Sequence, residues 1–242
     1  VLDQNVRKEA IKAQAEEVAK SLGGEVEIED DLLEEITYLV EYPTAFYGEF
    51  NKDYVKLPKE VVTTPMKEHQ RYFPVSKDGK LLPYFIAVRN GDKHAIDIVK
   101  AGNEKVLEAR LADALFFYDE DIKKPLESFV ENLKTVVFQA KLGTVYDKTL
   151  RIEKLAQDIV ETLDEKEILN DTLRAAKLCK ADLVTNMVFE FTELQGVMGR
   201  EYAKVGGEND AVAQAIFEHY LPRFAGDILP QTQEGIALSI AD

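Results

Sequence analysis

The sequence predicts an α+β protein that is mostly helical, with one small sheet in its first half. The run LLPYFIAVRN, residues 81–90, is rich in the aromatic and β-branched residues typical of strands. Apolar residues recur at helical spacing in residues 3–22, and after Asp121 the spacing stays helical to the end. We therefore expect a small α+β unit over residues 1–140 and an all-helical domain over residues 141–242.

Two helices and a strand are expected in the first fifty residues. Residues 3–22 carry an apolar stripe, and Gly23 and Gly24 end this helix because glycine adopts the left-handed exit easily. Asp30 is expected to cap a second helix with one apolar face. Residues 44–50, TAFYGEF, then have the aromatic content of a short strand.

A hairpin and a long helix are expected next. Asp78 and Gly79 form a tight-turn dipeptide between two apolar runs, so residues 81–90 should belong to a hairpin in a small sheet. Asn103 is expected to cap a long helix whose apolar stripe extends to Tyr118.

The second half reads as a series of amphipathic helices. We expect residues 125–138, a segment around 152–163 and residues 166–188 to be helical. In the last of these, Lys180 falls on the apolar stripe, where a lysine either snorkels to the rim or meets an acid in a pocket. Lys180 and its neighbour Asp182 are therefore candidate buried polar residues.

A dense apolar stretch, ADLVTNMVFEFTELQGVMGREY, covers residues 181–202. Thr192 and Glu193 resemble a helix start, and Gly196 and Gly199 allow close backbone approach within an apolar run. By itself this pattern indicates only tight helix packing.

A basic and aromatic cluster lies in the run PKEVVTTPMKEHQRYFPV, which starts at Pro58. Lys67 and Arg71 stand near Tyr72 and Phe73, a combination that suits binding a phosphate and stacking a base. The alternative is a solvated helix face whose rings anchor it to the core. Pro65 is expected at the first turn of a helix.

The charge balance argues against a protein whose whole surface binds nucleic acid. The net charge is −15, and residues 25–49 hold nine acidic residues and no Lys or Arg. Any RNA contact must therefore be a local patch. The single Cys179 fits a reducing cytoplasm, and no apolar run reaches the roughly 20 residues of a membrane helix.

Motifs for common cofactors are missing from the sequence. It contains no GxxxxGK[ST], no GxGxxG after a strand, no HExxH and no Cys/His pair at zinc spacing. Val1 is not a start methionine, and the final run EGIALSIAD is a helical pattern without a cap. We therefore expect an excised piece of a longer protein.

Long strings of the sequence resemble one known family. TTPMKEHQRYFPV, LPYFIAVRNG, GNEKVLEARLADALFFYDED, MVFEFTELQGVMGREYA and EHYLPRFAGD, in this order, are similar to the β subunit of bacterial glycyl-tRNA synthetase. The resemblance implies an aminoacyl-tRNA synthetase of α and β subunits, with the α subunit and tRNA(Gly) as partners and no membrane. It also implies ATP and Mg at the α subunit, and neither cofactor nor catalysis in this fragment alone.

The helical half is further similar to HD-type domains, which leaves an alternative function open. HD phosphohydrolases hold divalent metal with histidine and aspartate ligands. This sequence has no His-Asp dipeptide, and Ala181-Asp182 stands in the region where one would be sought. We expect the HD-like fold without the metal site. The alternative is a metal-dependent HD-like phosphohydrolase acting on nucleotides or RNA ends.

The expected RNA-binding residues are Arg174 and Lys177, with Lys67 and Arg71 as a second contact. Arg174 and Lys177 lie about one turn apart on the polar side of the predicted helix, so both can reach one phosphate backbone. The alternative is a solvated face whose charge is balanced by Asp171 and other nearby acids.

Overall fold

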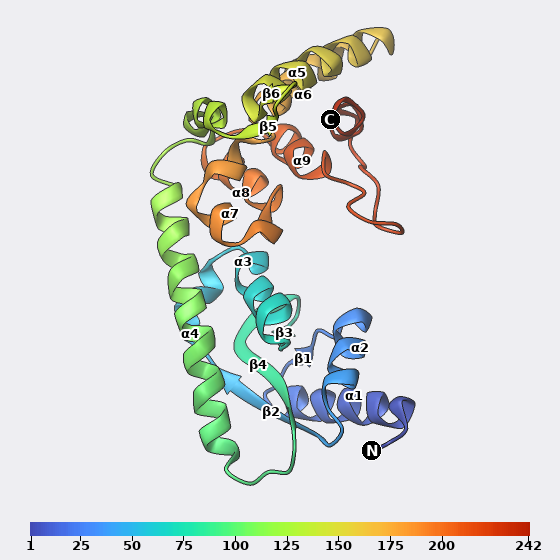
Figure 1. Cartoon of the computed structure of the whole chain (residues 1–242), viewed down its shortest axis with the longest axis vertical. Coiled ribbons are helices and arrows are strands. Elements are labelled where there is room, and N and C mark those ends of the chain that lie inside the picture. Colours follow the sequence, from blue (N-terminus) through green and yellow to red (C-terminus); the bar gives the residue numbers. More distant parts are fainter. The chain divides into compact units, whose positions relative to one another are not determined.

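The computed structural model describes all 242 residues, which form two compact units, unit 1 (1–116) and unit 2 (117–242) (Figure 1). The division falls within helix α4 (Ile96–Asp121), upstream of the boundary near residue 140 expected from the sequence. The predicted fold class, α+β and mostly helical, is confirmed. None of the helices combines the length and apolarity needed to cross a bilayer.

Unit 1 is built around a four-stranded antiparallel sheet. Its strand order is β1 (Glu25–Val26), β3 (Phe73–Lys77), β4 (Lys80–Asn90) and β2 (Pro43–Glu49). The helices of this unit are α1 (Gln4–Ser21), α2 (Asp30–Leu39), the short α3 (Lys59–Thr64) and the first part of α4. The predicted first helix and the strands at residues 44–50 and 81–90 are confirmed.

The core of unit 1 lies between the sheet and the two N-terminal helices. Ile11 and Ala15 of α1 and Ile36 of α2 are almost fully buried together with Phe73 and Ile86 of the sheet. The predicted hairpin is also confirmed, because β3 and β4 are joined at Asp78 and Gly79, with φ of 50° and 76°. Two consecutive positive φ angles are typical of a type I′ hairpin turn.

Two local predictions in unit 1, both of helix caps, were wrong. Asn103 does not cap the long helix, since α4 begins at Ile96 and Asn103 lies inside it. Asp30 is the first helical residue of α2, and the preceding Glu29 makes no side-chain cap bond. Pro65 is the first residue of the π-helical segment Pro65–Gln70, as expected for a proline at a first turn, and this segment follows α3 directly.

The backbone of Gly48 in β2 lies so close to the ring of Phe85 that no side chain fits there without a shift. Gly48 pairs with Phe85 of β4, and a Cβ added at Gly48 would lie 2.1 Å from Cζ of this buried ring. We predict that Gly48→Ala lowers the free energy of unfolding by about 3 kcal/mol, because the ring must leave its packed position. Gly102→Ala is the control. It meets open space within α4 and should raise stability by about 1 kcal/mol. Equal effects of the two changes in urea unfolding would contradict the prediction.

Unit 2 is helical apart from one two-stranded ribbon. A 3₁₀ segment (Leu126–Thr135) leads into β5 (Val137–Gln139) and β6 (Gly143–Thr144), and no strand follows residue 145, as expected. The α-helices after the ribbon are α5 (Val145–Thr162), α6 (Leu169–Leu178), α7 (Asn186–Glu190), α8 (Val197–Val205), α9 (Asp210–Glu218) and α10 (Gln233–Ala241).

The predicted continuous helix over residues 166–188 was wrong. Helix α6 ends at Leu178, and residues 181–184 form a 3₁₀ turn before α7 begins at Asn186. The Asp182 carboxylate accepts two backbone N–H groups from a distant segment, and the Thr185 hydroxyl caps α7. These tertiary and capping bonds replace the helical ones. The predicted helix over residues 125–138 is likewise a 3₁₀ segment followed by a strand.

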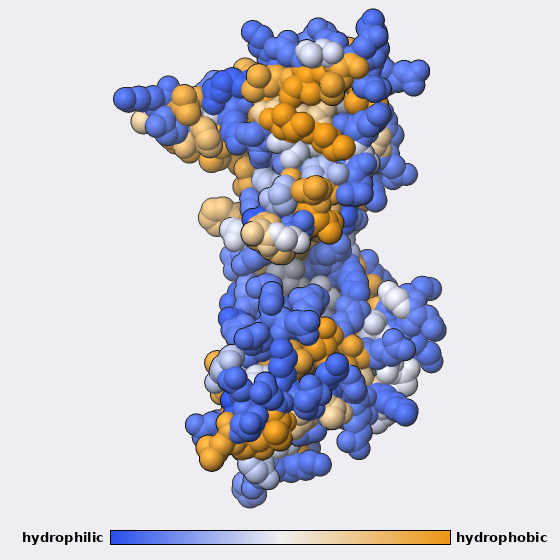
Figure 2. All heavy atoms as spheres, turned by 90° about the vertical axis from the view of Figure 1, so that its right-hand side faces the viewer, coloured by the Kyte–Doolittle hydropathy of each residue, from blue (hydrophilic) through white to orange (hydrophobic).

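The C-terminal part of unit 2 presents an apolar surface. Exposed apolar side chains occur on α10, at Ile236 and Ile240, and in the segment before it, at Phe224, Ile228 and Leu229. Figure 2 shows hydrophobic side chains gathered over this part of the unit. In this chain the face of α10 is therefore left uncovered.

Candidate functional site

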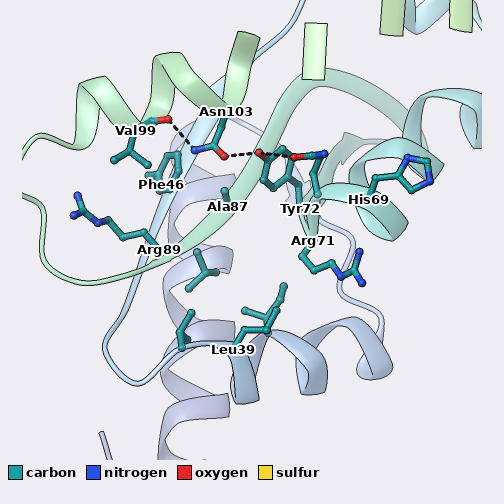
Figure 3. A pocket seen from close by; sticks show the side chains of 13 residues that line it. Leu39, Phe46, His69, Arg71, Tyr72, Ala87, Arg89, Val99 and Asn103 are labelled. Carbon is teal, nitrogen blue, oxygen red and sulfur yellow. Dashed lines mark hydrogen bonds between the residues drawn. The ribbon is translucent and has the colours of Figure 1, made fainter. Parts of the chain in front are cut away.

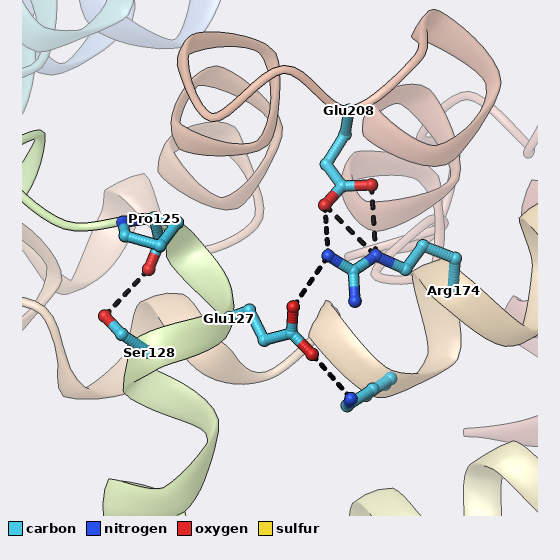
Figure 4. Close-up of polar contacts among 6 residues, drawn as sticks. Pro125, Glu127, Ser128, Arg174 and Glu208 are labelled. Atoms are coloured by element: carbon cyan, nitrogen blue, oxygen red, sulfur yellow. Dashed lines mark hydrogen bonds and ion pairs between the residues drawn. The ribbon is translucent and has the colours of Figure 1, made fainter.

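The predicted RNA-binding pair, Arg174 and Lys177, lies on α6 and is held by carboxylates. Arg174 makes a bidentate contact to Glu208, with an Nη2–Oε1 distance of 2.5 Å, and its Nη2 also lies 3.0 Å from Glu127 Oε2. Figure 4 shows Glu127 and Glu208 on either side of the Arg174 guanidinium. Lys177 Nζ lies 2.5 Å from the other oxygen of Glu127. Glu127 therefore bridges both cations.

The electrostatics of this cluster favour its charged form. Hydrogen bonds from Arg174 and then Lys177 lower the pKa of Glu127 to about 2, and the pKa of Arg174 is raised, first by Glu208 and then by Glu127. The balancing acids are not those expected from the sequence, since Asp171 instead accepts a bond from Asn209. A phosphate approaching this face must therefore compete with two carboxylates that are already in place.

The second predicted contact, Lys67 and Arg71, lies in unit 1 and is also ion-paired. Lys67 Nζ lies 2.6 Å from Glu29 Oε1, and Arg71 Nε lies 2.6 Å from Glu35 Oε1. Both partner acids belong to the acidic stretch at residues 25–49. The structure does not bring the two predicted contacts into one unit, and whether any of these four residues touches RNA stays a prediction.

Asp182 is fully buried and organises the stretch that includes Gly196 and Gly199. Its Oδ2 accepts the backbone N–H of Gly196 at 2.6 Å and that of Gly199 at 3.1 Å. A Cβ at Gly199 would lie 2.7 Å from Cγ2 of Ile216 and 3.0 Å from this oxygen. The predicted close backbone approach is confirmed, and its purpose is to let a buried carboxylate reach two amides. The other oxygen, Oδ1, has no hydrogen-bond partner.

Lys180 is buried, as predicted, but its partners are not Asp182. Its Nζ lies 2.8 Å from Asp242 Oδ2, 2.9 Å from His219 Nε2 and 4.0 Å from the ring centre of Tyr220. The Nδ1 of His219 faces the Ile216 carbonyl at 2.5 Å, so Nδ1–H donates there and Nε2 accepts from Lys180. Burial first, and then the Lys180 charge, lower the pKa of His219 to about 3. The imidazole is therefore neutral near pH 7.

These internal bonds bear on the phosphohydrolase alternative. Asp182 stands in the region where the His-Asp pair would be sought, and its Oδ2 binds backbone amides, while both nitrogens of His219, the one histidine of unit 2, are engaged. The structure contains no group of three or more His, Cys, Asp or Glu side chains arranged to hold a metal ion. The geometry thus assigns Asp182 and His219 to packing of the helices.

The buried Asp182 should make unit 2 sensitive to pH. Burial, as the largest cause, raises the pKa of Asp182 from 3.8 to about 6, although the two glycine amides oppose the shift. Between these values the folded chain holds a proton on Asp182 that the unfolded chain has lost, so the contribution of Asp182 to stability falls as pH rises from about 4 to about 6 and is level above that. We predict that Asp182→Asn lacks this loss, which amounts to about 3 kcal/mol. Urea unfolding of both proteins from pH 4 to pH 7 tests it, and parallel profiles would contradict it.

A cavity of about 360 Å³ opens in unit 1 (Figure 3). Its walls come from α2, β2, β4, α4 and the segment that follows α3. Leu39, Phe46 and Val99 contribute apolar surface, and Arg71 and Arg89 flank the cavity on opposite sides. Asn103 of α4 accepts a hydrogen bond from the Tyr72 hydroxyl, which connects two walls, and it donates to the Val99 carbonyl within α4 at 2.8 Å. The cavity therefore combines an apolar interior with cationic margins.

Two residues of this cavity were missed by the sequence analysis. Arg89 lies at the end of the clearest strand, and Asn103 was assigned to a helix cap. Their approach to Arg71 and Tyr72 depends on strand pairing and on the packing of α4, which a single sequence does not display. Asn103 lies four residues before the buried Leu107, so it shares the inner stripe of α4.

A comparison with known proteins decides the family. The family described as glycyl-tRNA synthetase beta subunit matches residues 1–242, the whole chain. The chain belongs to this family. The resemblance seen in the sequence is thereby confirmed.

Curated relatives agree with this assignment. The chain is 76% identical to the glycine–tRNA ligase beta subunit of Clostridioides difficile and 58% identical to that of Desulforamulus reducens. It is 55% identical to the same subunit of Syntrophomonas wolfei. Each match covers 100% of this chain and 35% of the relative. The chain thus spans about a third of the length of these relatives.

Proposed function

We propose that this chain is a tRNA-binding and scaffolding part of the β subunit of a two-subunit glycine–tRNA ligase. In this proposal it supports attachment of glycine to tRNA(Gly) by the α subunit, which holds ATP and Mg. The observation that carries the proposal is the family match over every residue of the chain. The names of the relatives, glycine–tRNA ligase beta subunit, support the same assignment.

The geometry supports a role in which RNA contacts are local and weak. The net charge of −15 repels RNA, and all four predicted contact residues are engaged by carboxylates. A phosphate gains only the difference between its own interaction with a cation and that of the carboxylate it displaces. Two or three such contacts give a slope of about −2 to −3 in log K against log salt. Scaffolding is therefore the larger part of the proposed role.

Removing the negative charge of Glu127 should strengthen tRNA binding, whereas reversing the positive charges of Arg174 and Lys177 should weaken it. We predict that Glu127→Gln, in the assembled ligase, lowers the KM for tRNA about two- to fivefold, because it releases Lys177 from its ion pair and leaves Arg174 with Glu208 as its only carboxylate partner. Arg174→Glu/Lys177→Glu should instead raise the KM and flatten its salt dependence. The measurement is aminoacylation across a salt series.

The matched control is Glu131→Gln. Glu131 lies on the same 3₁₀ segment and pairs with Lys134, so its removal changes the net charge equally without touching α6. It should leave the KM for tRNA nearly unchanged. If Glu127→Gln behaves like Glu131→Gln, and the double charge reversal has no effect in a folded enzyme, this face is not an RNA contact.

A further inference from the structure

We propose that the cavity of unit 1 flanked by Arg71 and Arg89 binds a nucleoside monophosphate group. The group is either a free mononucleotide or one unpaired nucleotide of an RNA strand, and the second source rests on the proposed function above. The base occupies the apolar interior, and the phosphate lies at the cationic margin.

The size and lining of the cavity suit such a group. Its volume of about 360 Å³ falls within the range of small-ligand pockets, roughly 300–1,000 Å³. Phe46, Leu39 and Val99 offer apolar surface for a flat ring, and base stacking against such surface tolerates any base. Gln70 adds a side-chain amide, which can both donate to and accept from the edge of a base, whereas the Asn103 amide is already bonded to Tyr72 and Val99.

Arg89 is the primary phosphate contact. It donates from Nη1 to the His94 carbonyl at 2.6 Å and forms no ion pair with a carboxylate, unlike Arg71, Arg174 and the lysines discussed above. Its Nε and Nη2 make no hydrogen bond within the chain. Guanidinium groups bind phosphate through two parallel N–H bonds, so Arg89 retains the geometry for this contact. Figure 3 shows its side chain at one margin of the cavity, with the guanidinium directed outward from the apolar interior.

Arg71 contributes from the opposite margin, and its backbone is strained. Its φ of 57° and ψ of 44° lie in the left-handed region, which non-glycine residues seldom occupy, and the π-helical segment Pro65–Gln70 leads into it. Both features are enriched at functional sites, where the surrounding structure holds the strain. Here they place Gln70, Arg71 and Tyr72 in succession along the wall of the cavity. A glycine would relieve the strain, and the chain carries arginine instead.

This strain separates a functional role of Arg71 from a structural one. Glycine adopts the left-handed conformation without strain, and the exposed ion pair to Glu35 contributes little. Arg71→Gly should therefore leave the fold as stable as before while it weakens nucleotide binding. Asp78→Gly is the matched control. It relieves the same conformation, φ of 50°, at the hairpin turn, outside the cavity lining, and should leave binding unchanged.

The experiment titrates the chain with AMP, adenosine and ribose 5-phosphate, and reads binding from NMR shifts of unit 1 amides. We expect AMP to bind at least tenfold more tightly than either part, and Arg89→Ala and Arg71→Gly each to weaken AMP binding about tenfold. A short single-stranded RNA then competes with AMP. Displacement identifies an RNA nucleotide as the source, and its absence identifies a free mononucleotide.

Two results would overturn the proposal. One is that AMP causes no shift of the residues lining the cavity at millimolar concentration. The other is that Arg89→Ala and Arg71→Gly bind AMP as the unchanged chain does. Neither outcome depends on the ligase assay with Glu127→Gln, so failure of this inference and failure of the proposed function are distinguishable.

Discussion

Replacing Asp121 should cause the largest loss of stability of any single carboxylate in unit 2. We predict that Asp121→Ala lowers the free energy of unfolding by about 4 kcal/mol, and that the isosteric Asp121→Asn still costs about 2–3 kcal/mol. The side chain is 2% exposed, and it accepts four hydrogen bonds. These come from both the backbone and the side-chain amide of Asn186, from the backbone of Met187 and from the Tyr202 hydroxyl.

Asp121→Asn should destabilise the fold because its side chain brings an N–H donor where the carboxylate only accepts. An asparagine keeps one oxygen, but its NH₂ group must face either the Asn186 amides at 2.8 and 3.0 Å or the Met187 amide and Tyr202 hydroxyl, both at 2.9 Å. At least one buried N–H then meets another donor. Amide hydrogen exchange in unit 2, with urea unfolding, measures the loss. Tyr202→Phe is the control and should cost about 1 kcal/mol, because it removes only one of the four bonds. An Asp121→Asn protein within 0.5 kcal/mol of the unchanged chain, on the roughly 1 kcal/mol scale of one hydrogen bond, would refute this account.

Loss of the buried Lys180 charge should also destabilise unit 2 strongly. We predict that Lys180→Met lowers the free energy of unfolding by about 3 kcal/mol, since it leaves the acceptor nitrogen of His219 unsatisfied and removes one of the two cations on Asp242. Lys166→Met is the control. Lys166 pairs with Asp164 at the surface with its side chain 78% exposed, so its loss should change stability by less than about 0.5 kcal/mol.

The same variant has a spectroscopic signature that simple loss of packing lacks. The Lys180 charge is the second cause, after burial, of the lowered His219 pKa, which is about 3 in the unchanged chain. Lys180→Met should therefore raise the pKa of His219, which NMR of the imidazole ring reports directly. An unchanged His219 titration, even with lower stability, would show that Lys180 does not act on this ring.

Sequence patterns over a few residues were sufficient to predict those elements that neighbouring residues along the chain determine. The apolar spacing of residues 3–22, the Asp78-Gly79 turn and the aromatic run at 81–90 specified a helix and a hairpin, and all three are present. These features depend on periodicity and turn chemistry, which act over a few residues.

Local rules failed where a distant group competes for the same backbone. The predicted helix over residues 166–188 breaks because Asp182 binds the amides of Gly196 and Gly199, which lie 14 and 17 residues further along the chain. Asn103 was assigned to a cap because its side chain suits one, but in the fold it binds Tyr72 across the cavity. Both outcomes depend on which segments pack together.

The family, the α+β fold class and the acidic character of this chain follow from its sequence alone. The packing of the folded chain, in contrast, sets which charges remain available to a ligand. Arg174 and Lys177 lie on the polar side of the predicted helix and look available there. In the fold, Glu127 binds both cations and Glu208 binds Arg174, although these acids lie 47 and 34 residues from Arg174 in the sequence. Arg89 gave no signal in the sequence, yet no carboxylate pairs with it in the fold. Ion pairing depends on distances of a few ångströms between side chains, and only packing brings such side chains together.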